Sequence, residues 1–364
     1  MIFRLANQSD DCQLRNLMRE TIVPGHIKIA YSREPDFFEA YRDIDDSTQV
    51  IVAEDNGQIG GVACRSIRNL LVNGKPSSVG YLSGLRLRPS VQNSTTLARG
   101  YAYLKTLHAD NKAPVYLTTI IHGNSRAKDI LTSGRASLPA YIPMGNYLTH
   151  VCPVKRRAVS PVVQDEVTIQ AATQISPHEL TDYLTQEGSR RQFFPVHKSN
   201  GQTSGILRSI GLDNVFVAQR QSKIVGTIAV WNQEKAKQHI IAGYSLIFRA
   251  LRPLLNLSLW ARNFHTLPKV GEELRYGAAA LICVRNNDLD VFKALLWHAL
   301  SMAAARGLHQ LAVGLHERDP LVPALNDLTH VVYRSWLYLV CWDGNPLDDT
   351  FDKTLIPYLE LGTL

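Results

Sequence analysis

Residues 79 to 131 constrain the fold of this chain more than any other stretch. The apolar run 79–87 predicts a strand, and the polar loop 92–96 leads from it into a helix. A second apolar strand over 114–121 then ends in His122. This order is typical of folds that splay two parallel strands and hold an extended nucleotide cofactor between them, with its phosphates at a helix N-terminus.

Length and cysteine usage bound the class of protein. The chain has 364 residues, of which 45% are hydrophobic, and this predicts two domains with two cores. The five cysteines are scattered, and none falls in a Cys-x-x-Cys pair or a Cys/His cluster. We therefore expect reduced thiols and no metal site. The start of the sequence turns polar by Asn7 and no run of eighteen apolar residues follows, so we expect a cytoplasmic protein.

The net charge of +7 leaves several partners open. Nucleic acid, a membrane surface or an anionic cofactor would each suit a basic protein. The densest basic cluster, Lys155-Arg156-Arg157, lies in a short segment that resembles a linker, and no aromatic residues are interleaved with it. We expect a solvated linker there, with no nucleic-acid partner and no stable membrane association.

The second half of the chain repeats the plan of the first. Val52-Ala53, followed by Ile59 and Gly61, matches Val217-Ala218, followed by Ile224 and Gly226, at an offset of 165 residues (217 minus 52). Both stretches predict a hairpin, and helices and strands follow in the same order in each half. The sequence therefore predicts tandem copies of one fold, with an N-terminal domain over 1–152, a linker over 153–166 and a C-terminal domain over 167–364.

Local signals place several elements within these halves. A helix is expected after Ser9, a pair of final strands around 141–151, and a capping box at Ser176 with Glu179. The extra segment 233–270 is leucine-rich and basic. We expect it to form one or two helices that pack across the halves, with a membrane-surface helix as the alternative.

The residues at the end of the first strand carry a family resemblance. Leu85-Arg86-Leu87-Arg88-Pro89, followed by Gln92, resembles the strand and phosphate loop of the GNAT-type N-acetyltransferase superfamily, and specifically its bacterial tandem-domain members. The resemblance implies an α/β fold of two tandem GNAT-like domains, each a mixed, mostly antiparallel sheet with a splayed parallel strand pair flanked by helices. It also implies an acyl-CoA-dependent N-acyltransferase. Acetyl-CoA or another acyl-CoA would be the cosubstrate, and a small-molecule or peptide amine would be the acceptor. Assembly into a homo-oligomer would be compatible with this resemblance.

The resemblance also assigns cofactor-binding residues, with departures from the family pattern. Thr95 and Leu97 stand where the phosphate loop has glycine or alanine; sliding the motif to Arg99-Gly100 restores one glycine, but we prefer the first alignment. Leu131 stands where the family often has a tyrosine that protonates CoA. The residues implied to hold the cofactor are Leu85, Arg86, Leu87, Gln92, Asn93, Ser94, Thr95, Thr96, Leu97, Asn124 and Ala127.

Catalytic candidates follow from the chemistry of acyl transfer to an amine, which needs a base and a proton donor for the sulfur. His122, at the exit of the second strand, is the candidate base, with a purely structural histidine as the alternative. Tyr81, Ser83, Tyr141 and also Tyr147 are candidates to replace the missing tyrosine.

The second half departs further from the family. Its loop, 285–290, has no glycine and carries two acids, which oppose a diphosphate. We therefore expect the second domain to bind no CoA and to wall the acceptor site or support an oligomer. Two other functions stay open, namely a non-catalytic acyl-CoA-binding or assembly protein and a nucleic-acid or membrane-associated module.

Overall fold

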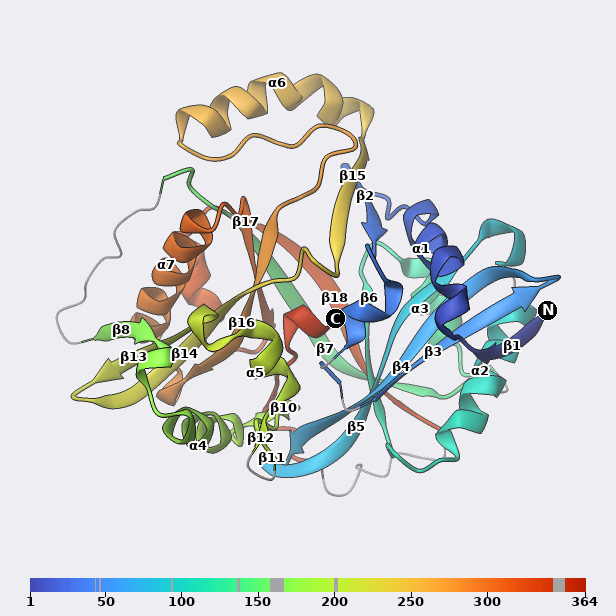
Figure 1. Cartoon of the computed structure of the whole chain (residues 1–364), viewed down its shortest axis with the longest axis horizontal. Helices are drawn as coiled ribbons and strands as arrows, with labels where there is room; N and C mark the ends of the chain where they lie inside the picture. Colours follow the sequence, from blue (N-terminus) through green and yellow to red (C-terminus); the bar gives the residue numbers. More distant parts are fainter. Residues whose placement is uncertain are drawn as a thin grey trace.

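A computed structural model describes the chain except for residues 43, 46, 93, 136–137, 158–166, 200–201 and 343–350. It shows a mixed α/β protein in which helices flank a large mixed sheet (Figure 1). The expected fold class is confirmed. The two expected sheets, however, are joined into one.

This sheet has 13 strands and runs across the whole molecule. The first half supplies β1 (Ile2–Leu5), β3 (Ser47–Asp55), β4 (Gln58–Val72), β5 (Lys75–Leu87), β6 (Tyr116–Ile121) and β7 (Ala140–Pro153). The second half supplies β8 (Thr168–Ala171), β13 (Val215–Arg220), β14 (Lys223–Asn232), β16 (Tyr276–Val284), β17 (Gln310–His316) and β18 (Val331–Cys341). The spatial order is β1-β3-β4-β5-β6-β18-β7-β17-β16-β14-β13-β8, and β10 (Phe194–Pro195) pairs with β4 off this path.

The two halves exchange their last strands at the centre of the sheet. β18, from the second half, pairs with β6 of the first half, and β7, from the first half, pairs with β17 of the second. β7 and β18 also pair with each other, with Tyr147 opposite Ser335. Residues 141–151 therefore lie in one strand, and the expectation of a pair there was wrong, because each half finds the partner for its last strand in the other half.

Helices cover both faces of the first half. α1 (Asp11–Glu20) buries Leu14, Leu17 and Met18 against one face of β3 and β4. α2 (Ser94–His108) and α3 (Ser125–Leu131) pack on the opposite face. The helix expected after Ser9 is confirmed, and its apolar stripe at helical spacing is the reason it forms.

The second half repeats this arrangement. The two hairpins predicted from the repeat are β3–β4 and β13–β14, and both have a bulge at the equivalent place, after Ala53 and after Ala218. α4 (Pro177–Gly188) and α7 (Leu289–Ala305) pack on the second-half sheet, and α5 (Gly205–Ile210) completes the core. The side chain of Ser176 caps no amide, so the predicted capping box was wrong. The prediction that Pro177 occupies the first helical position is confirmed.

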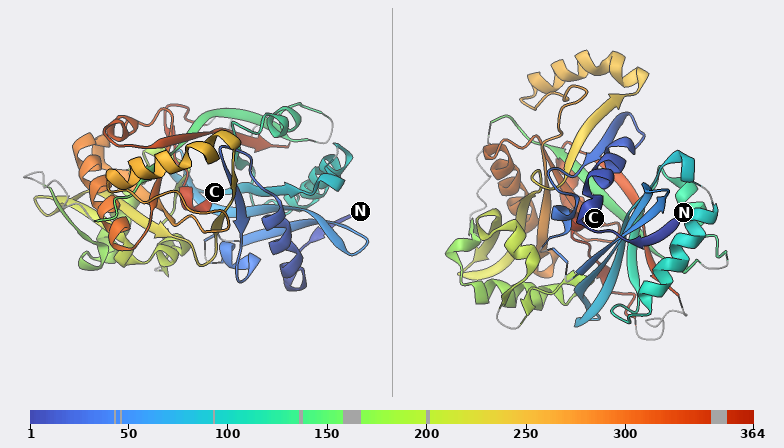
Figure 2. Two further views of the ribbon diagram at one scale, coloured as in Figure 1. Left: turned by 90° about the horizontal axis from the view of Figure 1, so that it is seen from above. Right: turned by 45° about the vertical axis from the view of Figure 1, so that its right-hand side comes forward.

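The segment 233–270 projects from the body. β15 (Gln238–Tyr244) pairs with β2 (Ile27–Ser32) in a separate two-stranded ribbon, and α6 (Leu246–Ala261) follows it. Figures 1 and 2 show α6 standing off the sheet, and none of its residues is buried. The expected helix exists. Arg252 of α6 bonds to its own returning segment, the Phe248 ring stacks on His26 of the first half, and the Trp260 carbonyl accepts from Arg156, so α6 contacts both halves' segments at its ends but buries no residue between them. No helix in the described part of the chain has the length and apolarity that crossing a membrane requires.

Short elements complete the described chain. They are β9 (Arg191–Gln192), β11 (Lys198–Ser199), β12 (Gln202–Thr203), β19 (Ile356–Pro357) and the 3-10 turns, of which η3 (Pro89–Val91) and η6 (Arg285–Asn287) follow β5 and β16. The last described segment, from β19 onward, runs back between the halves near the centre of the molecule (Figure 1).

Candidate functional site

The parallel strands β5 and β6 form a wedge in the first half. They pair at only two positions, Gly80 with Tyr116 and Tyr81 with Leu117, and no pairing follows along the remaining residues of either strand. Gly80 permits this close start, since a Cβ there would lie 2.0 Å from the Tyr116 ring. Beyond the paired positions Leu85 is 37% exposed at the open end. The splayed pair predicted from the sequence is therefore present.

A bulge in β5 lies at this wedge and places Gly84 and Leu85 opposite the single residue Ala63 of β4. The register with β4 shifts between Val62 and Cys64, and Gly84 adopts φ +66 inside the bulge. No side chain in the described ranges accepts a hydrogen bond from the amide of Gly84 or Leu85. These amides are suited to bind a carbonyl or a developing oxyanion. Sequence reasoning missed Gly84, although a glycine inside a strand is the usual signal of a bulge.

The equivalent strands of the second half also splay, but their bulge is occupied. β16 and β17 pair at four positions, and Leu281 has φ +50 at the bulge. The Leu281 amide donates to Glu360 Oε2 at 3.0 Å, and the Ile282 amide donates to the Tyr358 hydroxyl at 3.2 Å. Burial raises the pKa of Glu360 to about 7. The second wedge is thus closed by the chain's own side chains.

The residues of the predicted phosphate loop divide into exposed and buried. Gln92 and Thr95 are exposed after η3, whereas Thr96 is buried with its hydroxyl 3.6 Å from Met1 Sδ. Leu97 packs into the apolar cluster under α2. Asn93 and the side chain of Ser94 lie outside the described residues. Any contact of Thr96 and Leu97 with a cofactor is therefore restricted to their backbone amides.

The Asn-x-x-Ala motif forms a helix cap. The Asn124 side-chain oxygen accepts from the Ala127 amide at 3.2 Å and begins α3. Ala127 packs against the cluster under α2, and Leu131 is buried within it. The motif therefore has a structural role, beside which its implied contact with a cofactor stays a prediction.

Tyr81 and Ser83 lie on one face of the wedge. Tyr81 is buried, and its hydroxyl lies 3.3 Å from Thr119 Oγ1 across the gap. Burial raises the pKa of Tyr81, so the hydroxyl keeps its proton at neutral pH. Ser83 pairs with Cys64, whose side chain lies on the face covered by α1. Thr119, in β6, is a residue that sequence reasoning missed and that no local signal marks.

Tyr141 lies apart from this group, whereas Tyr147 shares a buried cluster with Tyr81. Tyr141 packs on the opposite face, where its hydroxyl lies 2.5 Å from that of Tyr101. The Tyr147 hydroxyl donates to the backbone oxygen of Leu359 at 2.9 Å. The structure thus separates Tyr141 from Tyr81 and Ser83, and the hydroxyl of Tyr147 already bonds to the chain.

His122 lies at the seam between the halves. Its Nε2 is 2.8 Å from Asn146 Oδ1, and its ring stacks on Trp336 at 4.1 Å. The Asn146 side chain in turn donates to Glu317 Oε2 at 2.7 Å. These contacts hold the imidazole between strands of both halves and give it a structural role independent of any proton transfer.

The loop of the second half has its helix amides occupied. Asp288 Oδ1 accepts from the amides of Asp290 and Val291 at the start of α7. Arg220 lies 3.4 Å from the same carboxylate. The α7 terminus is therefore capped by its own chain, as short Asp caps are in many helices.

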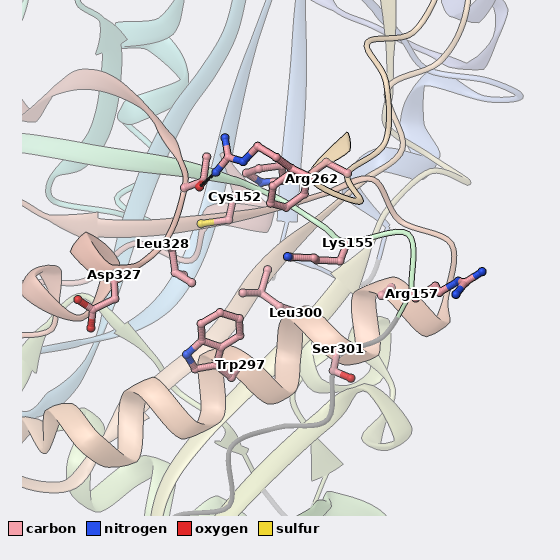
Figure 3. Close-up of a pocket in the computed structure, with 13 residues that line it drawn as sticks. Cys152, Lys155, Arg157, Arg262, Trp297, Leu300, Ser301, Asp327 and Leu328 are labelled. Atoms are coloured by element: carbon pink, nitrogen blue, oxygen red, sulfur yellow. Dashed lines mark hydrogen bonds between the residues drawn. The ribbon is translucent and has the colours of Figure 1, made fainter. Parts of the chain in front are cut away.

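A cavity of about 210 Å³ lies between α7 of the second half and the end of β7 with the segment after it, away from the wedge (Figure 3). Trp297, Leu300 and Ser301 of α7 line one side, and Cys152, Lys155 and Arg262 are among those lining the other. None of the site residues predicted from the sequence lines it.

Comparisons with known proteins rest on structure alone. No family model and no curated protein matches the sequence. Among solved structures, a GCN5-related N-acetyltransferase from Sphaerobacter thermophilus aligns over 93% of this chain and 94% of its own, with TM-score 0.55 and 11% identity. The fold is of the GNAT type.

A second GNAT-type structure extends the comparison. N-myristoyltransferase from Saccharomyces cerevisiae, solved with bound myristoyl-CoA, aligns over 98% of this chain and 89% of its own, with TM-score 0.59 and 12% identity. A glucosamine N-acetyltransferase region of a fungal multi-domain protein covers 93% of this chain and 38% of that protein, with TM-score 0.59 and 13% identity. At such identities the likeness shows the fold, and function has to be argued from the site.

Proposed function

We propose that this chain is an acyl-CoA-dependent N-acyltransferase with its active site at the first-half wedge. The acyl group is acetyl or longer, and the acceptor is an amine of a small molecule or peptide. The proposal places the thioester between β5 and β6 with its carbonyl oxygen at the bulge amides of Gly84 and Leu85.

The single observation that carries the proposal is the state of these amides. They lie in the bulge at an open wedge, and no described side chain accepts from them, while their second-half counterparts are held by Glu360 and Tyr358. Backbone donors that are preorganised in this way stabilise the charge that develops on a carbonyl oxygen. The likeness to solved acyltransferases, one of them with bound myristoyl-CoA, supports the same reaction class.

In the proposed step the neutral amine nitrogen attacks the thioester carbon, so that the C–N bond forms and the C–S bond breaks. The nitrogen then loses a proton, and the departing sulfur takes one up. Tyr81 is our proposed proton donor for the sulfur, because burial keeps its hydroxyl protonated and the hydroxyl points across the wedge to Thr119.

Other predicted residues keep narrower roles in this proposal. Gln92, Thr95 and the first amides of α2 would hold the diphosphate, and Ser83 would line the acceptor side. His122 stays a candidate base, but its contacts with Asn146 and Trp336 favour the structural role. Tyr141, on the far face, receives no role in the step.

Two measurements on the purified protein test the proposal. Calorimetric titration with acetyl-CoA and with a long-chain acyl-CoA reports binding, and free-thiol release against a panel of amines reports turnover. We expect both signals. If no acyl-CoA of either length binds, the proposal is wrong.

A non-catalytic acyl-CoA-binding protein is the second candidate. It is favoured by Leu131, which is buried in the apolar core where the family often has its proton donor. Binding without thiol release against every amine would decide for it.

A further inference from the structure

Three cations gather beside the wedge, and none has an acidic partner among the residues that the structure describes. Arg33 follows β2 and Lys237 precedes β15, so both lie just beyond the ribbon pair Ser32–Gln238. Arg86 follows the β5 bulge and pairs with Val62, whose side chain lies on the face covered by α1. The cluster therefore occupies the same face of the sheet as Ser83.

Burial makes this cluster unusual. Arg33 and Lys237 are each only 7% exposed. The Nε atoms of Arg33 and Arg86 are buried without a hydrogen-bond partner, and Lys237 donates only to the backbone oxygen of Gly362. Buried polar groups are nearly always satisfied, and buried cations are nearly always paired. The Nη1 atoms of Arg33 and Arg86 donate only to the neighbouring backbone oxygens of Ser32 and Leu85, so within the described residues neither guanidinium has a counter-ion and both are able to bind an anion.

The surroundings reinforce the positive charge. The guanidinium carbons of Arg33 and Arg86 lie 5.9 and 5.2 Å from the centroid of the Tyr31 ring, so two like charges share one aromatic side chain. Asp45, a nearby acid, is already paired with Arg68 at 2.6 Å. Burial, followed by repulsion from Arg33 and Arg68, lowers the pKa of Lys237 to about 7. Within the described residues, no carboxylate lies at ion-pair distance from any of the three cations.

We propose that Arg33, Arg86 and Lys237 bind an anionic group of the acceptor, so that the acceptor is an amine that also carries a carboxylate or a phosphate. This inference rests on the proposed function for the identity of the amine. Arg33 and Arg86 supply forked donors that match either anion, and Lys237 supplies a point charge. The position of Arg86, two residues past the bulge glycine, places this charge beside the proposed reaction centre.

Matched amine pairs test the proposal on the full chain. Glycine against glycinamide isolates the carboxylate, and phosphoethanolamine against ethanolamine isolates the phosphate. We expect one anionic member to have a kcat/KM at least about tenfold above its uncharged partner, and Arg33→Gln and Arg86→Gln to remove that preference. Arg42→Gln, which removes an exposed cation from the same half, should leave it intact.

A second readout keeps the test independent of turnover. Inorganic phosphate, added at constant ionic strength, should raise the Tm of the wild type but not of Arg33→Gln, and the unliganded variant should keep or exceed the wild-type Tm. If thiol release occurs without preference in either pair, the anion site is wrong and the proposed function stands. If no thiol is released but phosphate still stabilises the wild type alone, the anion site stands and the proposed function is wrong. A loss of Tm in Arg33→Gln without any phosphate effect would assign Arg33 to structure and overturn the site.

A second, independent observation concerns the outer face of α6. Its inner side chains, such as Arg252 and Asn256, bond only to the returning segment at Leu267 and Pro268. Its outer face carries six large apolar side chains that are 46 to 77% exposed, namely Leu246, Ile247, Leu251, Leu254, Leu257 and Trp260. An apolar stripe of this size on a projecting helix marks an interaction surface.

The charges around this stripe are of one sign. No Asp or Glu occurs between Lys235 and Gly271, whereas Arg249, Arg252, Arg262 and Lys269 lie in that span. Arg156 adds a further cation, with its guanidinium over the Trp260 ring at 5.6 Å. A second copy docking by twofold symmetry would bring these like charges together. An anionic lipid surface complements both the apolar stripe and the basic rim.

We infer that α6 lies on anionic membrane surfaces with its apolar stripe among the lipids. The inference departs from the expectation, drawn from the sequence, that the chain makes no stable membrane association. Co-sedimentation with vesicles of phosphatidylcholine alone, or mixed with phosphatidylglycerol, tests it. The protein should bind the mixed vesicles and lose binding as salt rises, and Leu254→Glu with Leu257→Glu should abolish binding.

Ile22→Glu is the matched control, because Ile22 is an exposed apolar side chain outside α6, and it should bind as the wild type does. If the wild type does not bind mixed vesicles, or if the α6 variant binds equally well, the inference is wrong. A dimer in sedimentation velocity that the α6 variant breaks, without vesicle binding, would assign the face to a second copy instead.

Discussion

The two halves of the chain build the same bulged strand and use its amides in opposite ways. In the first half the bulge is a glycine, and no described side chain accepts from the amides of Gly84 and Leu85. In the second half the bulge is Leu281, and Glu360 and Tyr358 accept from the two equivalent amides. The first-half wedge is thus open within the described residues, while the second-half wedge is filled by the segment that carries Tyr358 and Glu360.

The two halves therefore differ in whether the chain's own side chains bind the bulge amides. The filled half gains a buried hydrogen-bond network, in which Tyr358 also donates to Glu360 at 2.8 Å. In the open half no described side chain accepts from the bulge amides, which forgoes that stabilisation and, under the proposed function, leaves the amides available for a substrate.

Disturbing the bulge of the first wedge should have the largest effect. Gly84→Val directs a branched side chain toward Cys64 Sγ and the Tyr41 hydroxyl, which lie 3.5 and 3.6 Å from the new Cβ, and should displace the bulge amides. At a backbone of φ +66 it also costs about 1–2 kcal/mol in strain. We expect acyl-CoA binding and thiol release to fall below detection in a protein that still folds, as measured by calorimetry and circular dichroism.

Gly307→Val is the matched control for this variant. Gly307 has a similar φ of +70, lies in the second half, and has open space around its Cβ position. It should lose comparable stability but keep its thiol release. Full activity in Gly84→Val would show that the first wedge is not the active site.

Substituting Glu360, whose carboxylate fills the second wedge, should change how the free energy of unfolding depends on pH. The pKa of Glu360 is raised from 4.5 to about 7, so the folded state holds the extra proton between these values. The free energy of unfolding contributed by this group therefore falls as pH rises through that window, by about 3 kcal/mol in order of magnitude. Glu360→Gln should remove this loss, as seen in urea unfolding at about pH 5 and about pH 8.

The control is Glu179→Gln, which changes an exposed carboxylate on α4. It should follow the wild type at both pH values. A Glu360→Gln protein that is less stable than the wild type by the same amount at both pH values would contradict the assigned role of burial.

Removing the Tyr81 hydroxyl should lower turnover more than stability. Tyr81→Phe is expected to reduce kcat by about ten- to a hundredfold with KM for acyl-CoA little changed, because the proposed proton donor is lost. Tyr141→Phe, on the opposite face, should stay within about threefold of the wild type. Equal effects of the two substitutions would remove Tyr81 from the proposed step.

The smallest effect is expected at the seam. His122→Gln should cost about 1 kcal/mol in unfolding free energy through the lost stacking on Trp336, and should change kcat less than about fivefold. A loss of more than about a hundredfold, together with loss of the acidic limb of the pH–rate profile, would restore His122 as the general base.

The individual strands, loops and helices of the site were predicted from the sequence better than the way in which they come together. The order of strand, loop, helix and strand over 79–131, the repeat of the two hairpins and the buried stripe of α1 all follow from periodicity, which reports how each segment faces its neighbours. For the second-half loop the sequence predicted only that its acids oppose a diphosphate, and the capping of α7 by Asp288 is seen in the structure alone. A glycine inside a strand, such as Gly84, is a local signal of a bulge.

Other features have no local signal. The exchange of β7 and β18 depends on which strand edge is free after each half has folded, and both strands would read the same in either pairing. The capture of the Leu281 amide by Glu360 spans 79 residues, and the meeting of Arg33 with Lys237 joins two halves of the chain. The exposure of α6 could not be predicted from the sequence either, because the same apolar pattern is expected whether the helix packs against the protein or projects from it.

The amino-acid order by itself determined a duplicated α/β fold with a splayed strand pair in each half, because hydrophobic period and turn residues act over a few positions. Only the tertiary structure decided which wedge is open, which side chains share its face and what α6 leaves uncovered. Those outcomes depend on hydrogen bonds and charges brought together from distant parts of the chain, and no short-range pattern encodes them.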